Sequence, residues 1–316
     1  YAFWIGGGAL FLAVLWTVIT TKEYSPEEMA EFGETADHPD GETTLRALGS
    51  RSFVSSLVWI AAGVLVVIGV EQWSLEKEMY LLGGLLIAYG LASITAISLA
   101  RRGSTTNMLA NIVGDFSGMP TIMKKLALVQ FFSWSALFIM WIYTTPVVAQ
   151  YFFGSADPAS SGYQDAGNRV GTLFAIYNGV AAVAALTLLP WLSSRIGKAR
   201  THMVCLLIGS AAYASFLFIR DPQWLVLSEI GVGIAWASIL AMPYAILASN
   251  LGQRKLGIYM GLFNVFIVVP QLLVATVMGS IMKAAFPDEP IWTMLVAAVV
   301  MALAALAMLR VNEAKA

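Results

Sequence analysis

Charged side chains are scarce in this sequence. Asp, Glu, Lys and Arg make up 12% of its 316 residues, whereas a soluble domain carries about 25%. A water-soluble globule of this length could not cover its surface with so few charges. The net charge of −1 also leaves no basic face for an anionic polymer. These shortages exclude a cytosolic enzyme, a disordered protein and a nucleic-acid binder.

Cysteine and histidine are scarcer still. Cys205 is the only cysteine, so an intrachain disulfide is excluded. The two histidines, His38 and His202, lie outside the apolar runs of the sequence. With a single cysteine beside them, we expect no Cys/His metal site, and the sequence implies no cofactor.

Long apolar runs are abundant instead, with 59% hydrophobic residues and a mean hydropathy of +0.75. Because a bilayer core is crossed by about 20 mostly apolar residues, each run has the length of a membrane helix. The runs are continuous rather than alternating, which excludes a β-barrel. We therefore predict an all-α polytopic membrane protein with about nine transmembrane helices: 1–20, 52–70, 79–100, 126–150, 170–191, 203–219, 224–248, 257–282 and 291–309.

The placement of Lys and Arg predicts the orientation of these helices. If Lys22 faces the cytoplasm, fourteen basic residues lie on that side and only Lys77, Arg169, Arg220 and Lys283 lie outside. The first helix then begins outside, and residue 1 is Tyr rather than Met. We expect that an odd number of helices precedes it and that the chain is a fragment of a longer protein.

The last six predicted helices form two triplets, 126–219 and 224–309, which enter the membrane from opposite sides. The first helix of each triplet carries a tryptophan near mid-span and a late proline: Trp134 with Pro146, and Trp236 with Pro243. Interrupted helices at matching positions of inverted repeats point to the binding site of a transporter.

The segments before the triplets are different in character. Residues 21–49 hold eight acidic side chains and predict a solvated linker. The hairpin 52–100 is expected to turn at 71–74 on the outer side. Within 101–125, the spacing of four apolar residues predicts a short amphipathic helix at the inner interface: Leu109, Ile112, Val113 and Phe116.

Three stretches carry a family resemblance: QFFSWSALFIMWIY at 130–143, GIAWASILAMPYAILA at 233–248 and GIYMGLFNVFIVVPQ at 257–271. They resemble the sucrose/maltose-type sugar:proton symporters of the major facilitator superfamily, near the glycoside–pentoside–hexuronide symporters. The opening run through Thr21-Lys22-Glu23-Tyr24 resembles the end of that family's sixth helix.

This resemblance implies a domain plan. Residues 1–20 would be the last helix of the N-terminal half, whose first five helices are missing. Residues 21–125 would be the central cytoplasmic loop with an inserted transmembrane hairpin, 52–100, and 126–316 the C-terminal six-helix bundle. Helices 126–150, 170–191, 224–248 and 257–282 would line a central cavity, with 203–219 and 291–309 on the periphery.

Residues 192–201 are similar to the family's basic loop between helices eight and nine. The resemblance implies a cytoplasmic gating role for Arg195, Lys198 and Arg200. Ser194 stands where the family often has an acid that bridges to the arginine, which puts that salt bridge in doubt.

Glu229 is the only ionisable side chain within a predicted span. An intramembrane carboxylate is a functional-site hypothesis by default, so it is a candidate for proton coupling and for sugar binding. The alternative is that it reaches the outer interface and is simply hydrated. Glu229, Gly233 and Trp236 share one helix face with Leu240 and Pro243. A carboxylate beside an indole suits a sugar, although a tryptophan can also serve packing alone.

Other helices offer amides and aromatic rings. Residues 126–150 carry one stripe: Gln130, Ser133, Trp134, Leu137 and Trp141. Tyr177 and Asn178 lie about two turns into their helix, and Asn264 and Gln271 are spaced i, i+7. Because an unpaired amide in hydrocarbon is costly, these amides face protein or water. Pro270, beside Gln271, could hinge its helix.

We therefore predict a secondary transporter, not an enzyme, that moves a di- or oligosaccharide with protons or Na⁺ across a cell membrane, most simply a bacterial inner membrane. The predicted sugar site is Gln130, Trp134, Asn178, Glu229, Trp236, Asn264 and Gln271, with Glu229 as the proton-coupling candidate. The expected partners are the sugar, the coupling ion, the lipid bilayer and the missing N-terminal helices, with no nucleic acid. Three alternatives stay open: a facilitator of another small solute, a membrane-embedded enzyme and a structural membrane protein.

Overall fold

The computed structural model describes residues 2–21, 46–103, 107–251, 256–287 and 289–312, and all regular structure within these ranges is helical. Within these ranges, seven helices are long and apolar enough to cross a membrane: Val54–Trp73, Met79–Arg101, Thr121–Phe152, Ser161–Leu186, Pro222–Ala248, Gly257–Ala285 and Trp292–Arg310. The apolar helix α1 (Ala2–Thr20) stands beside them. This confirms the prediction of an all-α polytopic membrane protein.

Besides α1, one other predicted span is not among these seven helices: the span at 203–219, which corresponds to α10 (Lys198–Ser215). We predicted an apolar span at 203–219, but the helix begins five residues earlier and includes Lys198 and Arg200. Its first turn is therefore charged, and α10 is not among the long apolar helices.

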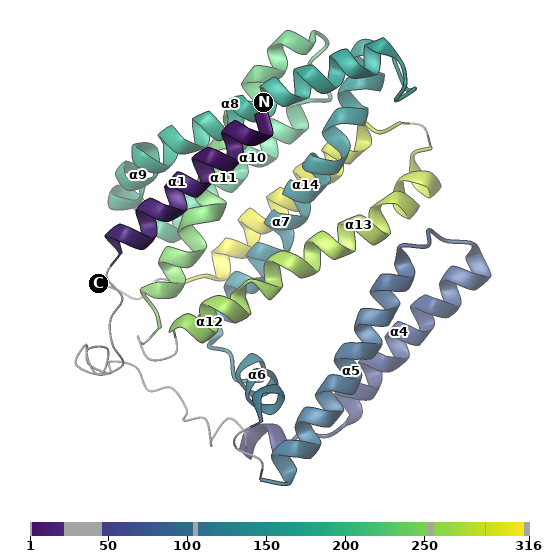
Figure 1. Ribbon diagram of the computed structural model, residues 1–316, viewed down its shortest axis with the longest axis vertical. Helices are drawn as coiled ribbons and strands as arrows, with labels where there is room; N and C mark the ends of the chain where they lie inside the picture. Colours follow the sequence, from purple (N-terminus) through teal and green to yellow (C-terminus); the bar gives the residue numbers. More distant parts are fainter. Residues whose placement is uncertain (1, 22–45, 104–106, 252–255, 288, 313–316) are drawn as a thin grey trace.

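The core of the bundle has two groups of helices (Figure 1). α7 (Thr121–Val147) packs against α13 (Val265–Ala285) and α14 (Trp292–Ala307), while α11 (Leu225–Ala248) packs against α8 (Ser161–Leu186) and α10. Contact between α10 and α14 joins the groups. One large cluster of buried apolar side chains runs through both.

Small residues allow the close approach within the second group. A Cβ added at Gly209 of α10 would lie 2.5 Å from the Cβ of Ala235 on α11. A Cβ at Gly231 would lie 2.7 Å from the Cβ of Ala212. Such contacts are how membrane helices gain packing energy, because lipid tails offer no hydrophobic drive for helix association.

The helix predicted at 170–191 is displaced. α8 begins at Ser161, where the hydroxyl of Ser160 accepts a hydrogen bond from the backbone N–H of Tyr163, and ends at Leu186. A separate helix, α9 (Leu188–Ile196), follows. The break at Thr187 comes three residues before Pro190, whose ring and missing N–H oppose continuation of the preceding helix.

Residues 192–201, expected to form a basic loop, are almost entirely helical. Arg195 lies in the last turn of α9, whereas Lys198 and Arg200 lie in the first turn of α10. Gly197 alone connects the two helices, with a φ of 85° that side-chain-bearing residues rarely adopt. This glycine lets the chain reverse without a longer loop.

The helix predicted at 257–282 is interrupted, but not at the proline. α12 (Leu256–Phe263) ends at Asn264, from which α13 begins, whereas Pro270 lies inside α13. The carbonyl of Asn264 accepts hydrogen bonds from the N–H groups of Ile267 and Val268 and starts the second helix. Asn264 is thus a single turn residue with helical φ and ψ inside one membrane-length span, Gly257–Ala285.

The predicted hairpin is present as α4 (Val54–Trp73) and α5 (Met79–Arg101). Its turn was predicted at 71–74, but α4 continues through Trp73 and the chain reverses from Ser74, which has a φ of 48°. The two helices meet at glycines: a Cβ at Gly63 would lie 2.6 Å from the carbonyl oxygen of Gly83.

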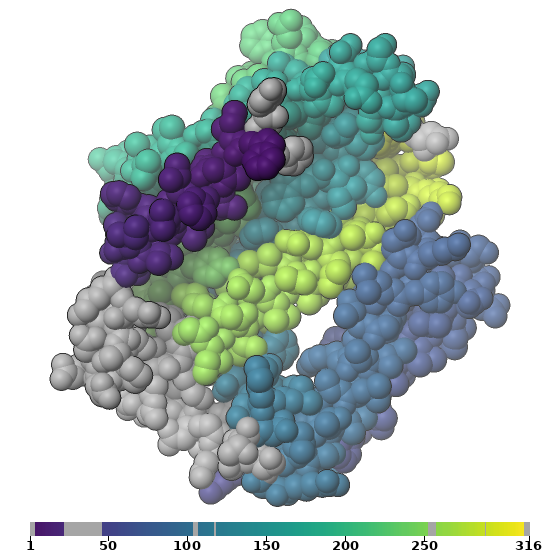
Figure 2. Space-filling view, in the orientation of Figure 1, coloured from purple at the N-terminus to yellow at the C-terminus, as the bar shows by residue number. Residues whose placement is uncertain are grey.

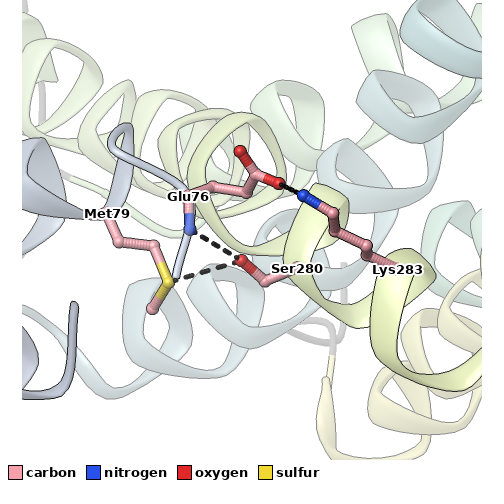
Figure 3. A network of polar contacts seen from close by, with 4 residues as sticks. All are labelled: Glu76, Met79, Ser280 and Lys283. Carbon is pink, nitrogen blue, oxygen red and sulfur yellow. Dashed lines mark hydrogen bonds and ion pairs between the residues drawn. The ribbon is translucent and has the colours of Figure 1, made fainter. Parts of the chain in front are cut away.

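The hairpin contacts the bundle near both of its ends. At the turn, Lys283 of α13 forms a 3.0 Å ion pair with Glu76 (Figure 3). Ser280 accepts a hydrogen bond from the backbone N–H of Glu76 and donates one to the sulfur of Met79. The hairpin turn and the end of α13 thus lie on the same side, as the predicted orientation requires.

At the other end, the short helix predicted within 101–125 is confirmed as α6 (Met108–Ser117), which begins at the side-chain cap of Asn107. Phe116 of α6 contacts Tyr89 of α5 and stacks on Phe266 of α13, with ring centroids 6.4 and 5.8 Å apart. Between the contact at the hairpin turn and the contact through α6, Figure 2 shows an opening between α13 and the hairpin. The hairpin is therefore held at its ends rather than packed along its length.

Other predicted segments are little covered or not described. The acidic linker predicted at 21–49 falls mostly outside the described residues. In α1, the side chains from Trp4 to Thr20 are all exposed, and a Cβ added at Gly6, Gly7 or Gly8 would meet none of the described residues within 4 Å.

Candidate functional site

Three tryptophans from two helices form the centre of the candidate site. Trp134 and Trp141 of α7 each lie 5.7 Å from Trp236 of α11 between ring centroids, and 6.2 Å from each other. All three contacts are edge-to-face, the arrangement that aromatic quadrupoles favour. We call these residues the tryptophan cluster.

A third helix joins the cluster through a hydrogen bond. The indole N–H of Trp141 donates to the hydroxyl of Tyr177 on α8 at 3.1 Å. α8 comes this close because Gly233, one turn before Trp236, has no side chain: a Cβ there would lie 2.6 Å from the carbonyl oxygen of Tyr177. The cluster therefore draws on residues that are about 100 positions apart in the sequence.

The two helices that form the cluster also carry buried polar atoms without partners in the described part of the chain. Both amide atoms of Gln130, the indole nitrogen of Trp134 and both carboxyl oxygens of Glu229 are buried and find no hydrogen-bond partner among the described residues. Leaving a buried polar group unpaired costs about 1–3 kcal/mol. These three side chains thus have hydrogen-bonding capacity that a polar ligand or a buried water could meet.

Helix geometry places two of these groups at opposite ends of the cluster. Gln130 lies one turn before Trp134, and Glu229 lies two turns before Trp236 on a helix that crosses the bundle in the opposite sense. Seven residues of α-helix correspond to about 10 Å. An amide and a carboxyl group therefore flank an aromatic surface from its two sides.

The burial of Glu229 settles one open alternative. Its side chain is fully buried, so the interpretation that it reaches the outer interface and is hydrated is wrong. It lies close enough to Tyr213 of α10 for the two to interact electrostatically, and the Tyr213 hydroxyl donates to the sulfur of Met140 on α7 at 3.5 Å. Glu229 thus belongs to the interior between α7, α10 and α11.

The remaining predicted amides lie apart from these unpaired groups. Asn178 is exposed and its amide donates to the carbonyl of Phe174 in its own helix at 2.8 Å. Asn264 is also exposed and accepts a 2.8 Å hydrogen bond from the hydroxyl of Tyr244. Gln271 is half-buried on α13.

The predicted sugar site thus divides in two. The structure brings Trp134 and Trp236 into contact, with Gln130 and Glu229 nearby along the same helices, whereas three amides lie on more open surfaces. It adds Trp141 and Tyr177, which the predicted site omitted. The signal for Trp141 was its i, i+7 spacing from Trp134, and Tyr177 is the neighbour of a residue that was chosen.

The three residues with a predicted gating role lie at the junction of α9 and α10. The guanidinium of Arg195 lies 4.9 Å from the ring centroid of Trp191, a cation–π contact within α9. Ser194, which replaces the expected acid, donates to the carbonyl of Trp191 in the same helix.

His202 is a further buried polar residue. It lies on α10, fully buried, with Nδ1 2.7 Å from the hydroxyl of Ser238 and Nε2 without a partner in the described part of the chain. Across those same ranges, no group of three or more His, Cys, Asp or Glu side chains is placed to hold a metal ion.

Comparisons with known proteins identify no relative of this chain. A scan against protein-family models finds no match, and a search of curated proteins finds no similar sequence.

Proposed function

We propose that this chain is part of a secondary transporter that moves a sugar, a di- or oligosaccharide such as sucrose or maltose, together with a proton. One observation carries the proposal: the two helices that form an aromatic cluster also carry Gln130 and Glu229, whose buried polar atoms find no partner among the described residues. Sugar hydroxyls both donate and accept hydrogen bonds, so they can satisfy an amide, a carboxylate and an indole N–H together.

The aromatic rings supply the second half of sugar recognition. The C–H face of a pyranose packs on an indole, and the cluster offers Trp141 and Trp236 as half-buried rings that a ligand could reach. Trp134 contacts both rings, is itself buried, and its N–H finds no partner in the described part of the chain. This combination favours a sugar over an apolar solute, which would leave the polar atoms unsatisfied.

Within this proposal Glu229 is the residue that carries the coupling proton. A buried carboxyl group can hold or release a proton as its surroundings change, and intramembrane carboxyl groups commonly serve such relays. Na⁺ is the alternative coupling ion, and proton-driven uptake in Na⁺-free buffer distinguishes the two.

We further propose that the bundle is the C-terminal half of a major facilitator fold in a cell membrane. Exposed faces that are small or polar support a missing second half. On α8 the uncovered residues include Asn168, Gly171, Thr172, Ala175, Asn178, Gly179 and Ala182. On α12 they include Gly257 and Gly261, followed by Asn264. Polar groups within the hydrocarbon depth are satisfied by protein or water, and small residues mark helix–helix contacts.

The test is a binding measurement on the purified chain in detergent micelles. Tryptophan fluorescence is followed during titration with sucrose and with maltose, and leucine and choline serve as non-sugar solutes. We expect saturable changes with at least one disaccharide. Tighter binding of a non-sugar solute would favour a facilitator of another substrate, and binding that survives Trp236→Leu would remove the cluster from the site.

A further inference from the structure

A second candidate site lies away from the tryptophan cluster. A cavity of about 500 Å³ opens where η1 (Val148–Phe152) and the chain after α10 meet the start of α14. The residues that matter for its chemistry are Tyr151, Leu217, Arg220, Glu289, Ile291 and Trp292. Arg220 belongs to the basic residues that the predicted topology places outside, so the cavity lies at the outer surface of the bundle.

The cavity wall carries one positive and one negative side chain that do not pair with each other. The guanidinium of Arg220 lies 5.5 Å from the ring centroid of Tyr151, and no carboxylate within the described ranges bridges to it. Glu289 accepts a 2.5 Å hydrogen bond from the indole N–H of Trp292. A ligand with separate anionic and cationic groups complements this arrangement, because each group meets an opposite charge.

The aromatic residues fit the cationic part of such a ligand. Trp292 is stacked on Phe286, with ring centroids 5.5 Å apart, which fixes the indole beside Glu289. An ammonium group at this position would gain a cation–π contact in addition to its contact with the carboxylate. Tyrosine and tryptophan are also the residues that gather at the level of lipid head groups.

The surface leading from the cavity identifies the source of the ligand. Ile291 lines the cavity, and four exposed apolar side chains continue from it down α14: Leu295, Val299, Leu303 and Leu306. Spacings of three and four residues keep them on one side of the helix. A free solute would make no use of this stripe, whereas an acyl chain attached to a head group in the cavity would lie along it.

We propose that this cavity binds the head group of an outer-leaflet phospholipid that carries both a phosphate and a primary ammonium group. Arg220 contacts the phosphate, Glu289 and Trp292 contact the ammonium, and one acyl chain follows the stripe on α14. The bound lipid ties the ends of η1, α10 and α14 together at the membrane surface.

The test is lipid titration of the detergent-solubilised chain, followed by native mass spectrometry. The probes are palmitoyl-oleoyl phosphatidylethanolamine and the matching phosphatidylglycerol, which has a phosphate but no ammonium. We expect the first to bind about tenfold more tightly. Arg220→Gln and Glu289→Gln should each weaken that binding about 10- to 100-fold, the effect of losing one hydrogen bond to a charged group.

Matched variants separate the site from general surface charge. Lys77→Gln and Glu78→Gln remove the same charges from the exposed turn of the hairpin and should leave lipid binding unchanged. Arg220→Lys keeps the charge and should retain most of the binding, which distinguishes a lost contact from a misfolded protein. Equal binding of the two lipids, or equal loss in the hairpin variants, would overturn the proposal. Displacement of the lipid by free phosphoethanolamine at equal affinity would instead identify a soluble zwitterion as the ligand and contradict a lipid site.

Discussion

Gln130 separates a ligand-binding role from a packing role more sharply than any other residue of the site. Its side chain is fully buried on α7, yet neither its amide nitrogen nor its amide oxygen finds a partner among the described residues. Leucine has a similar volume and no polar atom. Gln130→Leu therefore removes the unpaired groups with little change in packing.

The two roles predict opposite signs for the change in stability. If the Gln130 amide binds a ligand, it is buried without a hydrogen-bond partner whenever the ligand is absent. Gln130→Leu should then raise the free energy of unfolding by about 1–3 kcal/mol. The same substitution should weaken sugar binding by one neutral hydrogen bond, about 0.5–1.5 kcal/mol or about 2- to 13-fold in Kd. A packing role predicts loss of stability and unchanged binding.

The assay pairs unfolding in mixed micelles with sugar titration by tryptophan fluorescence. Thr144→Val is the matched control, because the buried Thr144 hydroxyl on the same helix already donates to the carbonyl of Met140 at 2.6 Å. Removing it should neither stabilise the protein nor alter sugar affinity. If Gln130→Leu destabilises the chain and leaves affinity intact, the reasoning that assigns Gln130 to a ligand site is refuted.

Four further outcomes are expected. Glu229→Gln should abolish proton-driven accumulation in the complete transporter while sugar exchange persists; accumulation that keeps its normal pH dependence would exclude it as the proton carrier. Gly233→Val should destabilise the bundle by about 1–3 kcal/mol, because its side chain would overlap the backbone of α8, whereas Gly171→Val, with nothing within 4 Å, should cost far less in thermal unfolding. Breaking the exposed Glu76–Lys283 pair by charge neutralisation should cost at most about 1 kcal/mol, and exchanging the two residues should restore it in a double-mutant cycle. Finally, this chain alone in vesicles should not accumulate sugar, because alternating access requires an opposing bundle; robust uptake would contradict the proposed half-transporter.

The helices were largely predictable because the bilayer constraint acts directly on sequence. Apolar runs of membrane length mark α4, α5, α7 and α11, and the structure has helices there. The predicted helix boundaries were wrong where polar residues lie inside a helix. The first turns of α8 include Gln164 and Asp165, which a search for apolar runs leaves out. The junction at Gly197 was missed for a different reason: one glycine with positive φ stands where the family resemblance implied a loop.

The candidate site was predictable only in part. Helical periodicity gives the face on which a residue lies, and matched positions in the two triplets selected Trp134 and Trp236, which meet. Periodicity does not give the partner of a polar group. Asn178 was chosen because an amide is costly in hydrocarbon, but its own helix supplies the acceptor at Phe174. Asn264 likewise accepts a hydrogen bond from Tyr244.

The same reasoning explains why the unpaired groups near the cluster are informative. Amides such as Asn178 show that this chain satisfies polar side chains cheaply where a backbone carbonyl is within reach. Gln130, Trp134 and Glu229 find no such partner among the described residues, and left unpaired at about 1–3 kcal/mol each they would cost roughly 3–9 kcal/mol together. That sum is comparable to the net stability of a typical domain, about 5–15 kcal/mol. Three apolar side chains would remove the cost without altering the hydropathy that places the helices in a membrane. The cost is relieved if a polar molecule enters the bundle and supplies the missing hydrogen bonds, which packing of apolar side chains cannot do.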